Sequence, residues 1–560
     1  MRDAKLKRNI LILAVAAVVA LFVRTAAFSF IGLDDAAYTF RNPFVAGGLS
    51  LPNVVEAFAN LRHGGIWMPV TYVSYMADAS FCRATGIPLI GWMHLGNVFL
   101  HAMNFILLCM MLRRFVERGS AVILICALLW AVHPLRAEPV AWIAARKELL
   151  WTLFALSGLI FWCAALRLED GRRRGHLLLA YAFCALACLA KPTAMCFPAL
   201  ALLLEWYHRR GFRIQACGRL VLRYLPLVAM AGATAAIAAY SQTHVAGQGA
   251  SSLYSGSLLQ RLVNAISSLG FYARATFWPF GLHVDCRAVN GLWPLDAEWN
   301  FAALALLAVV AVVFCPLSKK VLTVVGKAFD RGLVFFAVGW FLLSVLPTLG
   351  LLGSFGFEAH ADRFIYLPSM AFAFLAARVL SGHWRAAVRN AAIALTVMLA
   401  AVTFRQLGFW RDDDTAHQRA LACDPVHPRA MVHVADAFCS RRHDFDNGIA
   451  LYREAIVCST NVPGGGFDMA DVKARLAYAL ASRGRHEDFS EVRSLGVDVL
   501  REPSLDRRGM MLDALGTAFM YEGEWRRAIL LFQASIDAPS RFWPKASTRR
   551  KLAECQERIK

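Results

Sequence analysis

The sequence predicts an all-α fold, in which a polytopic bundle of membrane helices is followed by a domain of helical repeats. Of the 560 residues, 58% are hydrophobic, a larger share than soluble domains have. Apolar runs of membrane-spanning length recur from residue 10 to about residue 404. Beyond that point the composition turns polar, and small and aromatic residues recur at the spacing of paired helices. We therefore expect a membrane domain at 1–405 and a repeat domain at 406–560.

The apolar runs give about eleven predicted spans. The first run has an alternative interpretation as a signal peptide, but it lacks a small-residue cleavage site. Several runs are shorter than the roughly 20 residues that a perpendicular helix needs, so we expect their ends to extend into flanking sequence. The predicted spans are residues 10–28, 93–112, 120–132, 148–166, 176–190, 193–207, 220–240, 299–315, 332–350, 364–380 and 388–404.

The net charge of +20 follows membrane topology. Basic residues gather in alternate short loops, among them 167–174, 209–223 and 319–331, which the positive-inside rule assigns to the cytoplasm. We therefore expect no nucleic-acid partner. We expect a multi-pass protein, of a bacterial inner membrane, with a cytoplasmic N-terminus and a periplasmic repeat domain.

Two predicted outer segments are long, residues 29–92 and 241–298. Their amphipathic stretches, 54–61 and the one beginning at Leu258, are typical of helices lying on the membrane surface. A twelfth span at 258–280 is the alternative, which the polar residues within it disfavour. The fourteen cysteines show no metal-binding spacing, and pairing among Cys423, Cys439 and Cys458 stays open.

The polar C-terminal part predicts three helix pairs, at 430–458, 470–499 and 510–537, with a capping helix at 546–559. Their spacing resembles tetratricopeptide repeats of about 34 residues. Stacked repeats of this kind leave a concave face. The alternative is an unrelated helical bundle.

An acidic pair, Asp34 and Asp35, directly follows the first span. Adjacent carboxylates at a membrane surface repel each other and lose hydration, so such a pair indicates a bound cation, a proton or a reacting group. A helix N-cap or a topology signal is the plainer interpretation. Two carboxylates alone hold a hard cation weakly, so the need for a divalent metal stays open.

Cationic and polar groups lie on the same predicted side of the membrane as the acidic pair. They suit a ligand with a lipid tail, an anionic phosphate and a group to be transferred. Fixed cations stabilise negative charge on a leaving phosphate, and a carboxylate takes the proton of the acceptor hydroxyl. The candidate phosphate contacts are His133, Arg136, Arg146, Lys147, Lys191, Arg363 and Tyr366.

Other roles for these cations are open. Arg146 and Lys147 also suit snorkelling at a helix end, and Arg363 suits an ion pair with Asp362 or Glu358. Lys191 has no acidic neighbour in sequence, so a bound anion is its expected partner. His94 and His101 share a helix face; hydrogen bonds between helices are their plainer role, and metal or heme ligation the alternative.

Several short motifs occur in an order that resembles a known family. The motifs are Gly32-Leu33-Asp34-Asp35, Trp67-Met68-Pro69, His94 to Asn104, His133-Pro134 with Glu138, Arg146-Lys147-Glu148, Lys191-Pro192, Trp278-Pro279 with Asp285, and Arg363 with Tyr366-Leu367-Pro368. Their joint order is similar to that of the transmembrane-and-tetratricopeptide-repeat protein O-mannosyltransferases and their bacterial relatives, which are C-type, multi-span glycosyltransferases. The resemblance covers nearly the whole chain.

This resemblance implies a polyprenyl-phosphate-linked sugar donor and transfer of a mannose-like monosaccharide to Ser or Thr hydroxyls of exported proteins bound by the repeats. Asp34 or Asp35 is then the general base, with Asp35 slightly preferred, while the other orients the acceptor or helps hold a metal. Glu138 is expected to hold Arg136 or Arg146. His94 and Asp285 are expected in supporting roles.

One departure from the family pattern is Met68, where the family usually has a basic residue before the proline; this puts a donor contact in doubt. Two rival functions remain. One keeps the fold but glycosylates a lipid or surface polysaccharide, and the other is a transporter or assembly scaffold that recruits partners through its repeats.

Overall fold

The computed structural model describes residues 2–61, 65–116, 119–209, 217–245, 258–284, 331–351, 360–460, 469–501, 505–538 and 545–560. Within these ranges the regular elements are all helices, and no strand occurs. The all-α prediction is therefore confirmed. The chain divides into two units, Met1–Ala416 and His417–Lys560, where the sequence predicted a boundary between residues 405 and 406.

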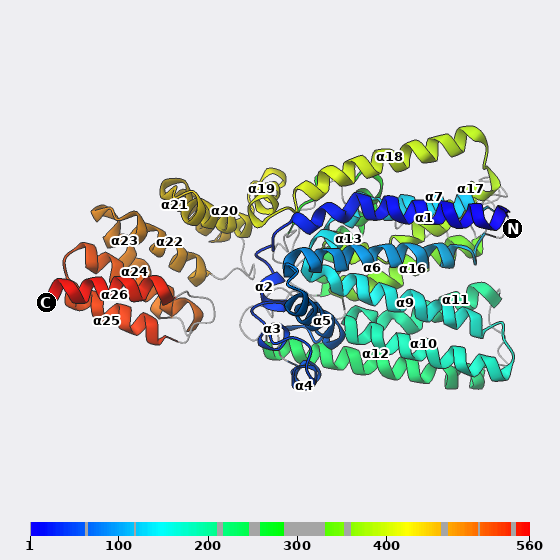
Figure 1. Ribbon diagram of the computed structural model, residues 1–560, viewed down its shortest axis with the longest axis horizontal. Coiled ribbons are helices and arrows are strands. Elements are labelled where there is room, and N and C mark those ends of the chain that lie inside the picture. Colours follow the sequence, from blue (N-terminus) through cyan, green and yellow to red (C-terminus); the bar gives the residue numbers. More distant parts are fainter. Residues whose placement is uncertain are drawn as a thin grey trace. The chain divides into compact units, whose positions relative to one another are not determined.

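The first unit contains the apolar helices. They are α1 (Arg2–Phe22), α2 (Asp35–Tyr38), α3 (Pro43–Ala46), α4 (Leu51–Ala59), α5 (Pro69–Thr85), α6 (Leu89–Leu112), α7 (Ser120–Ala131), α8 (Ala137–Ala141), α9 (Arg146–Ala165), α10 (Asp170–Ala190), α11 (Phe197–Arg209), α12 (Cys217–Val245), α13 (Leu258–Phe277), α16 (Arg331–Val345), α17 (Met370–Gly382) and α18 (Ala386–Gly408). Short 3-10 helices join them: η1 (Val23–Ala27), η3 (Pro134–Arg136), η4 (Ile143–Ala145), η5 (Pro192–Cys196), η8 (Leu346–Thr348) and η9 (Asp362–Ile365). Figure 1 shows the long helices running side by side, with α2, α3, α4 and α5 at the end of the bundle away from the N-terminus.

Six helices in the described ranges are long and apolar enough to cross a membrane, and each coincides with a predicted span. They are Arg8–Ala27, Leu89–Leu112, Ile143–Ala165, Gly171–Ala190, Val221–Ser241 and Ala386–Gly408. Two shorter apolar helices, Gly332–Thr348 and Met370–Gly382, fall on two further predicted spans. The chain is therefore a multi-pass membrane protein.

The remaining predicted spans have other outcomes. Residues 193–207 form η5 and α11, which are not among the described helices of spanning length. The predicted span 299–315 lies outside the described residues, so the total of about eleven spans stays a prediction. The helix α13 is also absent from the described helices that are apolar enough to span.

The predicted span at 120–132 ends in a sharp bend. The helix α7 and the segment Pro134–Ala141 are together long and apolar enough to cross a membrane, but they are bent by 62°. Pro134 lacks a backbone N–H and disfavours helical geometry at the residue before it. His133 is accordingly extended, and its Nδ1 accepts the N–H of Leu135 at 3.3 Å. This bend places the polar residues that follow it in short helical turns between two apolar helices.

The second unit is built from helix pairs. Its core buries small and aromatic side chains such as Ala477, Tyr452 and Phe489. A Cβ on Gly516 would lie 2.7 Å from the Phe532 ring, so glycine permits the close approach of two paired helices. The helices are α19 (Asp413–Cys423), which crosses the unit boundary, α20 (Pro428–Arg441) with α21 (Phe445–Thr460), α22 (Met469–Arg483) with α23 (Phe489–Leu500), α24 (Leu505–Tyr521) with α25 (Trp525–Asp537), and the single α26 (Lys545–Ile559). The three predicted pairs and the terminal helix are present.

Candidate active site

The two adjacent aspartates differ in their surroundings. Asp35 begins α2 and is fully buried. Its Oδ2 accepts the N–H of Ile31 at 2.9 Å, and its Oδ1 accepts the N–H of Ala144 at 2.7 Å. Asp35 thus ties the first outer segment to the turn that precedes α9. Burial, reinforced by the neighbouring charge of Asp34, raises the pKa of Asp35 to about 7 even though both N–H groups act to lower it.

Asp34, in contrast, keeps 44% of its side chain exposed. Its Oδ2 lies 3.7 Å from Nζ of Lys147, whose side chain is buried. The Lys147 ammonium also lies 4.5 Å from the ring centre of Tyr38 and 5.5 Å from that of Trp142. Aromatic faces attract cations. The pair therefore presents one accessible carboxylate beside a cation that two rings hold in position.

Arg363 joins the same cluster through Trp142. Its guanidinium lies 4.9 Å from the centre of the buried Trp142 ring. It forms an ion pair with Glu138, which also accepts the backbone N–H of Arg363 at 3.0 Å. Glu138 therefore pairs with Arg363 and not with Arg136 or Arg146. The other predicted partner of Arg363, Glu358, lies outside the described residues.

Lys191 approaches this cluster from the end of α10. Its Nζ lies 5.1 Å from the ring centre of Phe364, and the guanidinium of Arg363 lies 4.8 Å from the same ring. Lys191 forms a buried ion pair with Glu148, an acid 43 positions away in sequence; a bound anion as a further partner stays a prediction. Burial, together with the charges of Lys147 and Arg363, lowers the pKa of Lys191 to about 8 even though Glu148 acts to raise it.

Two predicted phosphate contacts lie in the interior of the bundle. Arg136 donates to the carbonyl oxygen of Tyr366 and to Oγ of Ser369, both at 2.9 Å. The hydroxyl of Tyr366 lies 2.6 Å from Nδ1 of His101. The other ring nitrogen of His101 lies 3.0 Å from the carbonyl oxygen of Ala131 in α7, which is the hydrogen bond between helices expected as its plainer role.

Arg146 is also fully engaged by the protein. Its Nε donates to Oδ1 of Asn97 at 3.0 Å, its Nη2 donates to the carbonyl oxygen of Met93 at 2.7 Å, and its Nη1 pairs with Asp78. The ring of Tyr75 lies 4.7 Å from the guanidinium. These contacts tie α9 to α5 and α6.

The other predicted residues lie outside the cluster. The Nε2 of His133 lies 3.0 Å from the carbonyl oxygen of Thr276, which links the bend after α7 to α13. His94 is buried on α6, with its ring 6.2 Å from that of Phe28. Asp285 lies outside the described residues.

Sequence reasoning missed two residues of this region. Asp78 is the one acid within α5, and an acid in a largely apolar helix is a signal that it meets a cation. Trp142 carried no comparable signal, because an aromatic residue near a helix end is common in membrane proteins. Its indole N–H and Oδ1 of Asp362 are buried and have no hydrogen-bond partner within the described part of the chain, which is unusual for buried polar atoms.

The fold and this cluster define a class, a multi-pass all-α membrane protein with an accessible carboxylate and three buried cations at one end of its bundle. No protein-family model matches the chain. Among curated proteins it is similar to "Protein O-mannosyl-transferase F38B6.6" of Caenorhabditis elegans, with 23% identity over 312 residues, which cover 55% of this chain and 41% of the relative. It is also similar to "Protein O-mannosyl-transferase TMTC4" of Homo sapiens, with 26% identity over 352 residues, or 55% of this chain and 45% of the relative.

The mouse protein of the same name is 25% identical over 349 residues, with 55% of this chain and 46% of the relative covered. The chain thus spans less than half the length of the curated relatives that it matches. The resemblance to transmembrane-and-tetratricopeptide-repeat protein O-mannosyltransferases is confirmed, at modest identity over about half of the chain.

Proposed function

We propose that this chain is a membrane glycosyltransferase that moves a mannose-like monosaccharide from a polyprenyl phosphate to Ser or Thr hydroxyls of exported polypeptides. The observation that carries the proposal is the exposed carboxylate of Asp34 beside Lys147, in one cluster with Arg363 and Lys191. The names of the relatives support the reaction class. The polyprenyl-phosphate donor and the exported acceptor are what the family resemblance implies, and the cations of the cluster suit a phosphate.

In the proposed reaction, the acceptor hydroxyl oxygen forms a bond to the anomeric carbon of the sugar. The bond between that carbon and the phosphate oxygen breaks, and its electron pair stays on the phosphate. Asp34 takes the hydroxyl proton as general base, because its carboxylate is the accessible one of the pair. Asp35, which was slightly preferred from sequence, becomes the positioning residue in this proposal, because both of its oxygens already accept backbone N–H groups.

Lys147 and Arg363 are the proposed partners of the phosphate. Both lie against the Trp142 ring, so negative charge that grows on a phosphate near this ring meets two fixed cations. The protein holds both cations in place before the reaction begins. They therefore do not have to reorganise as negative charge develops on the phosphate. Lys191, paired with Glu148, lies 5.1 Å from the centre of the Phe364 ring and is the third cation of the cluster. The unpartnered indole N–H of Trp142 provides a further donor.

The remaining candidate contacts take structural roles in this proposal. Both terminal nitrogens of Arg136, the guanidinium of Arg146 and the hydroxyl of Tyr366 bond to other protein groups in the bundle interior. A divalent metal also fits poorly, because backbone N–H groups occupy both oxygens of Asp35 and the Lys147 ammonium lies beside Asp34. Hard cations need several oxygen ligands, so no step of the proposal uses a metal.

The repeat unit is the proposed binding surface for the acceptor polypeptide, since stacked helix pairs form grooves that bind extended chains. A lipid or polysaccharide acceptor would need no such unit. Presentation of a polypeptide requires the repeats and the acidic pair on the same side of the membrane, outside the cytoplasm. A topology reporter fused after residue 410 should therefore be active only outside the cytoplasm.

The function is tested with the purified full chain, a panel of polyprenyl-phosphate-linked sugars and candidate exported proteins. We expect the intact mass of an acceptor protein to increase by one monosaccharide with a lipid-linked donor, and not with the corresponding nucleotide sugar. Transfer to a lipid alone would favour the rival acceptor. If the protein is folded, as cooperative melting would show, but transfers sugar from none of the lipid-linked donors, the transporter or scaffold interpretation would remain.

A further inference from the structure

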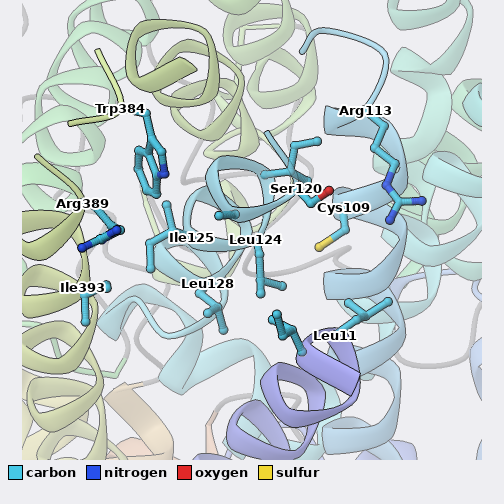
Figure 2. A pocket seen from close by; sticks show the side chains of 13 residues that line it. Leu11, Cys109, Arg113, Ser120, Leu124, Ile125, Leu128, Trp384, Arg389 and Ile393 are labelled. Carbon is cyan, nitrogen blue, oxygen red and sulfur yellow. The ribbon is translucent and has the colours of Figure 1, made fainter. Parts of the chain in front are cut away.

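A second site lies near the opposite end of α1 from the acidic pair. A cavity of about 240 Å³ opens between the first half of α1, the end of α6, the helix α7 and the start of α18. Figure 2 shows the side chains of the 13 residues that line it. From Ile10, in the cavity wall, to Phe28, at the end of η1, the chain rises by about 25 Å. The cavity is therefore separate from the proposed active site.

The cavity wall is apolar at its centre and cationic at its rim. Leu124 and Leu128 of α7 face Ile393 of α18 across it, while Arg113 and Arg389 flank it on opposite sides (Figure 2). No acid is present among the 13 lining residues. Both arginines are exposed. An apolar space flanked by cations matches a lipid acyl chain with an anionic headgroup.

Helix electrostatics strengthen this match. Arg389 lies in the first turn of α18, which holds no acid, although a cation is unfavourable at the positive end of a helix. The cavity also includes Ser120, the first residue of α7, whose first turn likewise has no acid and no side-chain cap. An anion at the rim would offset the positive ends of both helices as well as the two guanidinium groups.

We propose that this cavity binds an anionic glycerophospholipid. Its anionic headgroup lies at the edge of the cavity that Arg113 and Arg389 flank, and one acyl chain occupies the apolar space beside Leu128. Both arginines belong to basic loops that the positive-inside rule assigns to the cytoplasm, so the lipid comes from the cytoplasmic leaflet, whereas the proposed sugar transfer takes place at the other membrane surface. The site therefore does not depend on the proposed function.

The test measures lipid binding to the full chain in detergent by native mass spectrometry, with phosphatidylglycerol and phosphatidylcholine as probes. We expect phosphatidylglycerol to bind more tightly. Arg113→Gln and Arg389→Gln should each weaken it about fivefold, and the double variant about thirtyfold, since a cation near a lipid headgroup contributes on this scale. Leu128→Trp, which keeps both charges but fills the cavity, should also weaken binding.

A matched control removes two exposed arginines from another basic cluster, at the start of α10, Arg172→Gln with Arg174→Gln. We expect this double variant to bind phosphatidylglycerol as the unaltered chain does. If the control lost as much phosphatidylglycerol binding as the Arg113 and Arg389 double variant, the attraction would be unspecific and the proposal would be overturned. Equal binding of phosphatidylglycerol and phosphatidylcholine would also overturn it. Preferential displacement of phosphatidylglycerol by a polyprenyl phosphate would assign the cavity to an isoprenoid instead. If the double arginine variant does not fold, Leu128→Trp and Arg389→Gln alone decide.

Discussion

Replacing the two adjacent aspartates one at a time separates a catalytic role from a positioning role. Asp34→Asn removes an exposed carboxylate that lies 3.7 Å from Lys147. Asparagine has nearly the same shape as aspartate, and solvent at the half-exposed Asp34 screens its pair with the buried Lys147, so the melting temperature should fall less than in Asp35→Asn. If Asp34 is the general base, the rate of transfer at saturating donor should fall by about 10²–10⁴.

Asp35→Asn should have the opposite profile. An asparagine has one side-chain carbonyl oxygen, so only one of the N–H groups of Ile31 and Ala144 keeps its acceptor. A buried donor left without an acceptor costs about 1–3 kcal/mol. We therefore expect a clearly lower melting temperature, with a smaller loss of rate per folded molecule than in Asp34→Asn.

The assay pairs initial rates of sugar transfer by the purified full chain with thermal unfolding in the same detergent. Glu56→Gln provides a matched control, because Glu56 is another exposed acid in the first outer segment and bonds only to the nearby Asn60 among its described contacts. It should alter neither measurement. Full activity of Asp34→Asn would refute the assignment. The assignment would also be refuted if Asp35→Asn melted normally but lost as much of the rate of sugar transfer as Asp34→Asn.

Three further predictions concern stability. The pKa of Asp35 is raised from 3.8 to about 7, so the folded chain holds the proton of this carboxyl more tightly than the unfolded chain does. This contribution to stability is fully present below about pH 4 and is lost as the pH rises through 7. The melting temperature should therefore fall more steeply from pH 5 to pH 8 in the unaltered chain than in Asp35→Asn. Parallel curves of melting temperature against pH for the two proteins would contradict the raised pKa of Asp35. Arg363→Gln should lower the free energy of unfolding by about 3–5 kcal/mol, because it leaves Glu138 buried without its cation. The double variant with Glu138→Gln should regain part of this loss in urea or thermal unfolding. If the losses of the two single variants simply add in the double variant, the two residues do not act as a pair. A Cβ on Gly96 would lie 2.8 Å from Nη2 of Arg146, so Gly96→Ala should cost about 1–3 kcal/mol by overpacking, whereas Gly171→Ala, which meets nothing within 4 Å, should not lower the melting temperature.

The sequence by itself determined the local features of this protein. Hydrophobic length located the long spans, since a helix must cover the bilayer with apolar residues. Proline and polar residues marked the bend after α7, and the alternation of small and aromatic residues gave the helix pairs of the second unit. The acidic pair was visible because two adjacent carboxylates are rare beside a membrane span. Each of these signals lies within one turn or one helix.

Only the tertiary structure decided which charges meet. Glu148 pairs with Lys191 across 43 positions, and Glu138 bonds to Arg363 across 225 positions. A buried charge needs a partner, but any acid on a neighbouring helix satisfies that need, so the choice depends on how the helices pack. The same packing buries Asp35 and leaves Asp34 accessible, although the two residues are chemically identical neighbours.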